Sequence, residues 1–171
     1  MDNYIPTVYK KTIFDIDYEK LYNNSVRHLL FDLDNTLTMA HSRELTEETI
    51  KLISMLKEKF TVDLVSNSRK KRVEVIAKLL DIEYISFARK PATWSFKAIQ
   101  EKYNCNKEAL LIIGDQLMTD IIGGNRYGIK TALIDPVGMD AVVTYFNRWR
   151  ENRKLKKLAE TGKLERGKYY E

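Results

Sequence analysis

The sequence contains a single cysteine, Cys105, among its 171 residues. One cysteine cannot form an internal disulfide, and it excludes a cysteine-rich zinc site. Seven glycines and three prolines, without tracts, argue against long linkers or a disordered chain. The chain has no apolar run long enough to cross a bilayer, and its first residues lack the apolar core of a signal peptide. We therefore expect a folded domain in the reducing environment of the cytoplasm.

The positive charge is concentrated near the C-terminus. Residues 148–168 hold nine basic and three acidic side chains, whereas the whole chain has a net charge of only +5. We therefore divide the chain into one domain, residues 1–147, and a basic helical tail, residues 148–171. Such a tail can attract the membrane surface or nucleic acid, and it can equally be a solvated helix end. Charge alone leaves these alternatives open.

Short apolar runs alternate with segments of helical period along the chain, which is typical of an α/β fold. The pattern predicts a Rossmann-like parallel sheet of about five strands, flanked by helices on both faces. The expected strands are 28–31, 62–65, 84–87, 109–113 and 130–134. The expected helices are about 46–60, around 73–80, one opened by Pro91, 120–127, and an amphipathic helix beyond Pro136 with Val142, Val143, Phe146 and Trp149.

Two carboxylates follow the first expected strand. Asp32 and Asp34 are two residues apart, so in extended backbone both side chains point to the same face and can address one reaction centre. One carboxylate can attack phosphorus while the other, when protonated, delivers a proton to the leaving oxygen. Two anions this close repel each other and the phosphate, so they require a cation, and oxygen ligands suit magnesium. The pattern does not distinguish magnesium from manganese.

Further polar residues follow other expected strands, at the edge where α/β proteins bind ligands. Asp115 could ligate the same metal, and Asp120 could hold a metal-bound water. Ser66 and Asn67 offer a hydroxyl and an amide to phosphate oxygens, and Lys90 offers a fixed positive charge. Four strand ends are therefore expected to converge on one phosphate and its metal.

These residues carry a resemblance to a known family. The motifs DLDNT (32–36), SN (66–67), RKP (89–91) and GDQLMTD (114–120) resemble the four motifs of the haloacid dehalogenase (HAD) superfamily, in the correct order. More narrowly, GDQLMTDIIGGNRYG (114–128) and the chain length resemble the YqeG family, in HAD subfamily IIIA. A lone DxD motif would be weak evidence for this superfamily, but four motifs in the correct order at strand ends are strong evidence.

The resemblance implies a role for each residue. Asp32 would be the nucleophile, forming an aspartyl-phosphate, and also a metal ligand. Asp34 would be the acid/base, with its backbone carbonyl on Mg²⁺, and Asp115 would complete the metal site with Asp120 supporting it. The remaining residues would bind the phosphoryl group: Thr36, Ser66, Asn67 and Lys90.

The spacing of the motifs bears on the substrate. The interval 32–66 is filled by one loop and one helix, and the interval 66–90 by one helix and one strand, so we expect a HAD core without a cap domain. An uncovered site favours a phosphate displayed on something large. Because members of the resembling family are linked to phosphatidylglycerophosphate, we expect a lipid-headgroup phosphate as substrate, with peripheral membrane contact through the tail. The alternatives are a phosphatase of a soluble nucleotide, sugar phosphate or phosphoprotein, and a non-enzymatic RNA- or ribosome-binding module. Intact Asp32 and Asp34 speak against that module, so nucleic acid is not the expected partner; the oligomeric state is not predicted.

Overall fold

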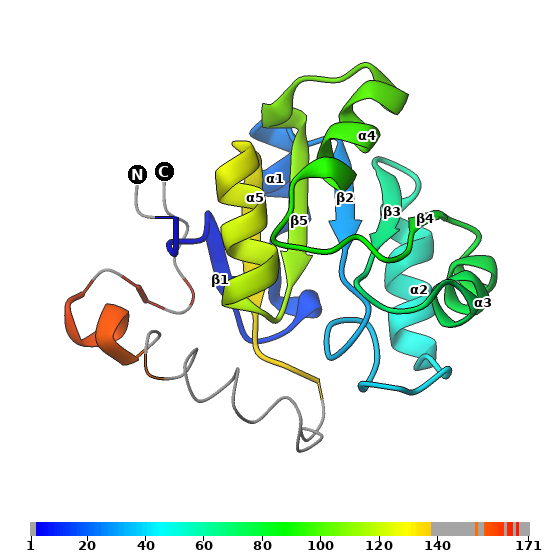
Figure 1. The fold of residues 1–171 in the computed structure, drawn as a ribbon, viewed down its shortest axis with the longest axis horizontal. Helices are drawn as coiled ribbons and strands as arrows, with labels where there is room; N and C mark the ends of the chain where they lie inside the picture. The colour runs from blue at the N-terminus through cyan, green and yellow to red at the C-terminus, as the bar shows by residue number, and fades with distance from the viewer. Residues whose placement is uncertain (1–2, 138–152, 154–155, 163, 166, 168–171) are drawn as a thin grey trace.

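Six parallel strands form one sheet in the computed structural model of the protein, in the order β1-β6-β5-β2-β3-β4. The structure describes residues 3–137, 153, 156–162, 164–165 and 167. In Figure 1 the arrowheads of β2, β3 and β5 point the same way, so the carboxyl ends of these strands share one edge. The strands are β1 (Val8–Lys10), β2 (His28–Phe31), β3 (Thr61–Val65), β4 (Glu83–Ile85), β5 (Leu110–Gly114) and β6 (Lys130–Ile134).

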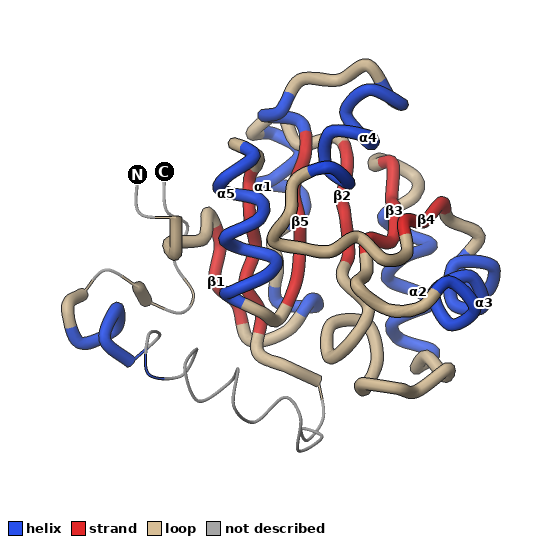
Figure 2. Tube along the Cα trace, viewed as in Figure 1, coloured by secondary structure: helices blue, strands red, loops and turns tan. Residues whose placement is uncertain are grey.

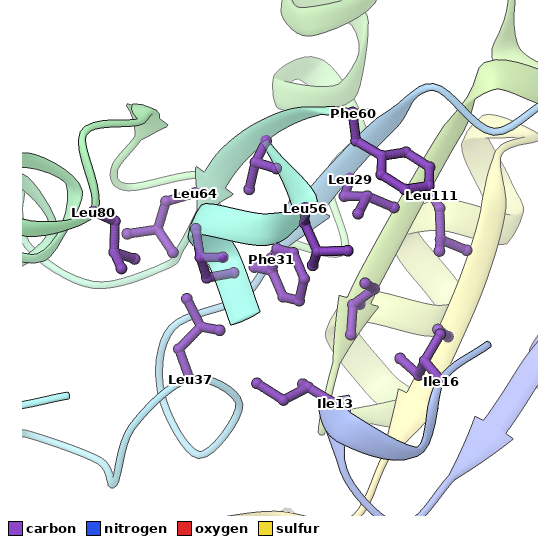
Figure 3. Close-up of a cluster of buried hydrophobic side chains, with 14 of the residues drawn as sticks. Ile13, Ile16, Leu29, Phe31, Leu37, Leu56, Phe60, Leu64, Leu80 and Leu111 are labelled. Atoms are coloured by element: carbon purple, nitrogen blue, oxygen red, sulfur yellow. The ribbon is translucent and has the colours of Figure 1, made fainter. Parts of the chain in front are cut away.

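The central strands are apolar on both faces, as expected for a parallel sheet covered by helices on each side. Leu29 and Phe31 of β2 contribute to the larger core cluster, whereas Leu30 between them belongs to a second cluster on the opposite face. Figure 3 shows part of the larger cluster, with Leu29, Phe31 and Leu111 beside Leu56 of a covering helix. This alternation fixes the register of β2 between its neighbours.

Five helices cover the two faces of the sheet within the described part of the chain. Apolar residues of α1, α2 and α3 pack in the larger cluster, and those of α4 pack in the second, on the face that α5 also covers. Figure 2 shows α4 and α5 in front of the strands and α1 behind them. The helices are α1 (Tyr18–Asn23), α2 (Glu47–Leu56), α3 (Lys70–Leu80), α4 (Trp94–Tyr103) and α5 (Ile122–Tyr127); short turns lie at Ile13–Asp15, Lys107–Ala109 and Leu117–Ile121.

The predicted α/β fold with helices on both faces is confirmed, with local differences. The edge strand β1 was not expected, because a strand of three residues, only one of them fully buried, carries no periodic signal. Pro91 does not open α4, which begins at Trp94. The backbone N–H and carbonyl of Lys90 are both bound by the side chain of Asn67, so the chain around Pro91 is held in a loop. Similarly, α2 ends at Leu56, before the predicted Phe60.

Part of the basic tail is described. Residues 156–160 are helical, and the side chains of Leu158 and Leu164 are buried. The Gly167 N–H donates to the carbonyl of Tyr9 in the edge strand β1. The expected helix that carries Val142 and Trp149 lies outside the described residues. Among the residues that are described, no helix has the length and apolar character needed to cross a membrane.

The chain order places a switch point beside β2. From β2 the chain adds β3 and β4 on one side, and then returns to β5 on the other side of β2. Register pairs Phe31, the last residue of β2, with both Leu64 and Ile113. Ligands of open α/β sheets bind at the carboxyl edge where the strand order reverses. The residues that follow β2 and β5 therefore lie where a ligand site is expected.

Candidate active site

A buried lysine joins two carboxylates at the carboxyl edge of the sheet. Lys90 Nζ lies 2.6 Å from Asp32 Oδ1 and 2.6 Å from Asp120 Oδ1. It also donates to the carbonyl oxygen of Val65, the last residue of β3, at a distance of 2.7 Å. The Lys90 side chain is 1% exposed, so all three contacts are shielded from water. Lys90 thus ties the ends of β2 and β3 to the segment that follows β5.

A third carboxylate completes an acidic group. One carboxylate oxygen each from Asp32, Asp115 and Asp120 lies within 4.8 Å of the others, and all three residues are buried. Gly114 makes this approach feasible, because a Cβ at that position would lie 2.3 Å from the Asp120 carboxyl carbon. The Gln116 N–H donates to Asp120 Oδ2 and orients it. The strand end at Gly114 is therefore shaped to admit the Asp120 side chain.

The side chain of Asp34 has different partners. Its Oδ1 lies 2.6 Å from Arg72 Nη1 of α3, and it also accepts from the His41 N–H. Its Oδ2 accepts from the Ser68 hydroxyl. The Asp34 carboxylate is therefore not part of the group formed by Asp32, Asp115 and Asp120. The metal contact predicted for Asp34 runs through its backbone carbonyl, so it does not depend on the position of this carboxylate. The sequence did not indicate Arg72 as a site residue, because it stands in a basic run that resembles a solvated helix start. Ser68 was also missed, although its position directly after the predicted Ser66-Asn67 motif was a usable signal.

The loops after β3 and β4 hold each other in place. The Ser66 N–H donates to the carbonyl of Ile85, and the Ala88 N–H donates back to the carbonyl of Ser66. Ser66 Oγ accepts from the Ser68 N–H, and both amide atoms of Asn67 bind the Lys90 backbone. In this arrangement Asn67 positions Lys90; phosphate binding by Asn67 and Ser66 stays a prediction.

Thr36 lies in the loop after β2. Its side chain is fully buried, and its hydroxyl has no hydrogen-bond partner in the described part of the structure. The hydroxyl is therefore available to a bound molecule, since a buried polar group without a partner is unfavourable. The structure thus brings Lys90 together with the carboxylates of residues 32, 115 and 120, and it leaves Thr36 on the adjoining loop.

Burial controls the electrostatics of the acidic group. It raises the pKa of Asp32 to about 7; Lys90 opposes this rise, and the charges of Asp120 and Asp34 add to it. Burial alone would lower the pKa of Lys90, but Asp120 and Asp32 outweigh burial and raise it. Lys90 therefore stays a cation. Its single positive charge does not offset the burial of Asp32 and the repulsion from the neighbouring carboxylates.

The acidic group fits a divalent cation. Three buried carboxylates face one buried ammonium, and uncompensated charge is costly away from water. Carboxylate oxygens are the ligands that hard divalent ions prefer. Within the described residues 32–90 no domain is inserted between the motifs: only a loop and α2 separate Asp32 from β3, and only α3 and β4 separate Ser66 from Lys90.

Comparisons with known proteins give the family and the fold of the chain. A family model described as HAD-hydrolase-like matches residues 87–136, which include Lys90, Asp115 and Asp120. The solved structure of D,D-heptose 1,7-bisphosphate phosphatase from B. bronchiseptica, complexed with magnesium and phosphate, is similar with a TM-score of 0.53. It is 14% identical, over 63% of this chain and 80% of that chain. This likeness shows the fold.

Two sequence relatives are informative. The chain is 27% identical over 143 residues to "Phosphatidylglycerophosphate phosphatase 1, chloroplastic/mitochondrial" of Arabidopsis thaliana, covering 78% of this chain and 41% of that protein. It is 37% identical over 164 residues to "Probable phosphatase YqeG" of Bacillus subtilis (strain 168), covering 95% of each chain. With that identity over nearly the full length of both chains, the protein belongs to the YqeG family of HAD-like phosphatases.

Proposed function

We propose that the protein is a magnesium-dependent phosphomonoester hydrolase that transfers the phosphoryl group to Asp32 and acts on phosphatidylglycerophosphate, giving phosphatidylglycerol. The observation that carries the chemistry is the buried contact of Asp32 with Lys90, next to Asp115 and Asp120. Such a cluster can surround a transferring phosphoryl group with fixed charge. Asp32, Asp115 and the backbone carbonyl of Asp34 would hold Mg²⁺, which supplies positive charge against the phosphoryl oxygens.

The reaction has two steps that reuse the same side chains. In the first, an Asp32 oxygen bonds to phosphorus, the bond to the leaving oxygen breaks, and Asp34 gives that oxygen a proton. In the second, Asp34 takes a proton from water, the water oxygen bonds to phosphorus, and the bond to Asp32 breaks. Phosphate leaves and Asp32 is regenerated. Lys90 remains beside the Asp32 oxygen throughout.

Asp34 must change partners to take part. Both of its oxygens are engaged, by Arg72 and His41 on one side and by Ser68 on the other. An arriving phosphate competes for Arg72, because a guanidinium binds phosphate oxygens in the same forked geometry as a carboxylate. The substrate would thereby release Asp34 toward the leaving oxygen.

The lipid substrate is supported by two observations. Relatives from Arabidopsis thaliana and Chlamydomonas reinhardtii bear the name phosphatidylglycerophosphate phosphatase, with 27% and 25% identity. In addition, no domain is inserted between the motifs within the described residues 32–90, which favours access for a phosphate displayed at a membrane surface. Peripheral contact through the basic tail belongs to the same proposal, because cations attract anionic lipid.

The test is phosphate release from phosphatidylglycerophosphate in mixed micelles with Mg²⁺. The purified protein should release phosphate, chelation should stop release, and acid-quenched protein should retain radiolabelled phosphate. Asp32→Asn should abolish both release and label. Asp81→Asn is the matched control: Asp81 is 98% exposed in an ion pair with Lys57, and its left-handed backbone suits asparagine. Label retained by Asp32→Asn would refute the nucleophile.

Lipid and soluble substrates are separated by the same assay. Phosphate release from nucleotides or sugar phosphates without release from the lipid would refute the lipid substrate and leave the phosphatase activity standing.

The role of the tail is tested with the double variant Lys156→Gln with Lys157→Gln. This variant is preferable to deletion, because deletion would also remove the buried Leu158 and Leu164. Sedimentation with anionic vesicles should fall in this variant and at high salt. Unchanged sedimentation would exclude these two lysines from membrane contact.

A further inference from the structure

A pocket of about 360 Å³ lies beside the catalytic loop. Its walls come from the turn at Ile13–Asp15, from the loop that follows Asp34, and from the start of α2. The volume is within the range of roughly 300–1,000 Å³ that is usual for small-molecule sites. Figure 3 shows two of its lining residues, Ile13 and Leu37, at the same end of the core cluster. The pocket is thus a hollow between the catalytic loop and the core.

The pocket adjoins the acid/base side of the site. Arg72, which pairs with Asp34, also donates to the carbonyl oxygens of Met39 and Ser42, and both of these residues line the pocket. Asp34 is the group that would protonate the leaving oxygen. Arg72 therefore links this proposed proton donor to the wall of the pocket.

The lining combines one available hydroxyl with an apolar mouth. Thr36 lines the pocket, and its buried hydroxyl lacks a hydrogen-bond partner in the described residues. The exposed side chains of Phe14, Met39 and Val137, which are 51%, 56% and 39% exposed, line the same pocket. Three exposed apolar side chains around one hollow mark a site for an apolar ligand.

We propose that this pocket binds the alcohol part of an amphiphilic phosphomonoester, with a hydrocarbon chain lying against Phe14 and Met39. An oxygen of the alcohol accepts from the Thr36 hydroxyl, in place of the phosphoryl contact that the family resemblance implies for this residue. The proposal rests on the proposed phosphatase chemistry and adds to it the place where the leaving group is recognised. A lipid is the committed occupant, because its alcohol and its chain belong to one molecule that continues from the reacting phosphate. Without a cap domain, this pocket supplies the contacts beyond the phosphate that specificity requires.

The experiment measures kcat/KM for glycerol 3-phosphate and for 1-acyl-glycerol 3-phosphates of increasing chain length, below their micelle concentrations. For the parent protein, kcat/KM should rise by about two- to fourfold per methylene until the chain leaves the pocket. Phe14→Ser with Met39→Ser should flatten this rise. Thr36→Val should lower kcat/KM about tenfold for every chain length and leave the slope intact, because it removes only a hydrogen bond.

Met55→Ser is the matched control. Met55 is 55% exposed, almost the same fraction as Met39, but it lies on α2 away from the pocket lining. Its slope should equal that of the parent. Turnover without any chain-length dependence in the parent would overturn the pocket assignment alone. An equal flattening by Met55→Ser would overturn it too, whereas the absence of all phosphate release would instead refute the proposed function.

Discussion

The contact of Lys90 with two carboxylates predicts a large, specific loss of stability in Lys90→Met. The substitution keeps an unbranched side chain, one atom shorter, and removes the positive charge that lies 2.6 Å from both Asp32 and Asp120. Removing one partner of a buried ion pair costs about 3–5 kcal/mol, because the other partner stays buried without compensation. A domain of this kind is stable by only about 5–15 kcal/mol in total. The variant should therefore lose a substantial part of its free energy of unfolding.

Urea unfolding followed by circular dichroism, with a chelator present, measures this loss. The double variant Lys90→Met with Asp120→Asn should regain part of it, since one of the two stranded carboxylates is then neutral. Lys78→Met is the control: Lys78 pairs with Glu74 on the surface of α3 and is 75% exposed. An exposed pair of this kind contributes at most about 0.5 kcal/mol.

Two results would refute the reasoning. A loss in Lys90→Met no larger than that in Lys78→Met would show that Lys90 does not compensate buried charge. An additive loss in the double variant, without regain, would show that Lys90 and Asp120 act independently. Activity provides a second readout, because loss of a cation beside the phosphoryl group should lower kcat by about 100-fold or more.

Three further predictions concern the same fold. Gly114→Ala should lower Mg²⁺ affinity and activity by about 10- to 100-fold, because the new Cβ would lie 2.3 Å from the Asp120 carboxyl carbon; isothermal titration with Mg²⁺ checks this. Burial raises the pKa of Asp63 even though Tyr103 donates to it. In the pH window between the ordinary value of 3.8 and the raised pKa, the folded state therefore binds more protons than the unfolded state and loses stability as pH rises. Asp63→Asn should therefore gain stability relative to the parent as pH increases, and parallel pH curves would contradict this. Mg²⁺ at about 100 times its dissociation constant should stabilise the protein by about 2.7 kcal/mol; an unchanged melting temperature would contradict metal binding.

The sequence predicts the fold well because its signals are local. The continuous apolar runs of β2 and β5 require both faces of these strands to be covered, and this requirement is visible in a few consecutive residues. The location of the polar residues that follow the strands is predictable too, because parallel strands bring their carboxyl ends to one edge of the sheet. The short edge strand β1 escapes this logic, because it is defined by its pairing with β6 more than a hundred residues later.

The contacts within the site are less predictable because they depend on long-range packing. Lys90 is separated from Asp32 by 58 residues, and the pattern gives its charge but not its second partner, Asp120. Asn67 has the residue type of a phosphate ligand, yet its amide holds the Lys90 backbone. Arg72 reaches Asp34 only because α3 packs beside the loop after β2. Residue type therefore indicates the chemistry, whereas the fold decides which groups meet.

The two carboxylates of the DxD motif end in opposite electrostatic settings. Asp32 shares Lys90 with Asp120 and lies beside Asp115, so negative charge is in excess and burial holds its pKa near 7. Asp34 pairs with Arg72, which has no second carboxylate partner in the described residues, and its side chain is partly exposed to water. In the proposed reaction a cation is therefore needed on the Asp32 side, because a nucleophilic Asp32 would have to be ionised at the moment of attack. Environments that differ this much allow two identical side chains, two residues apart, to perform different tasks in one reaction.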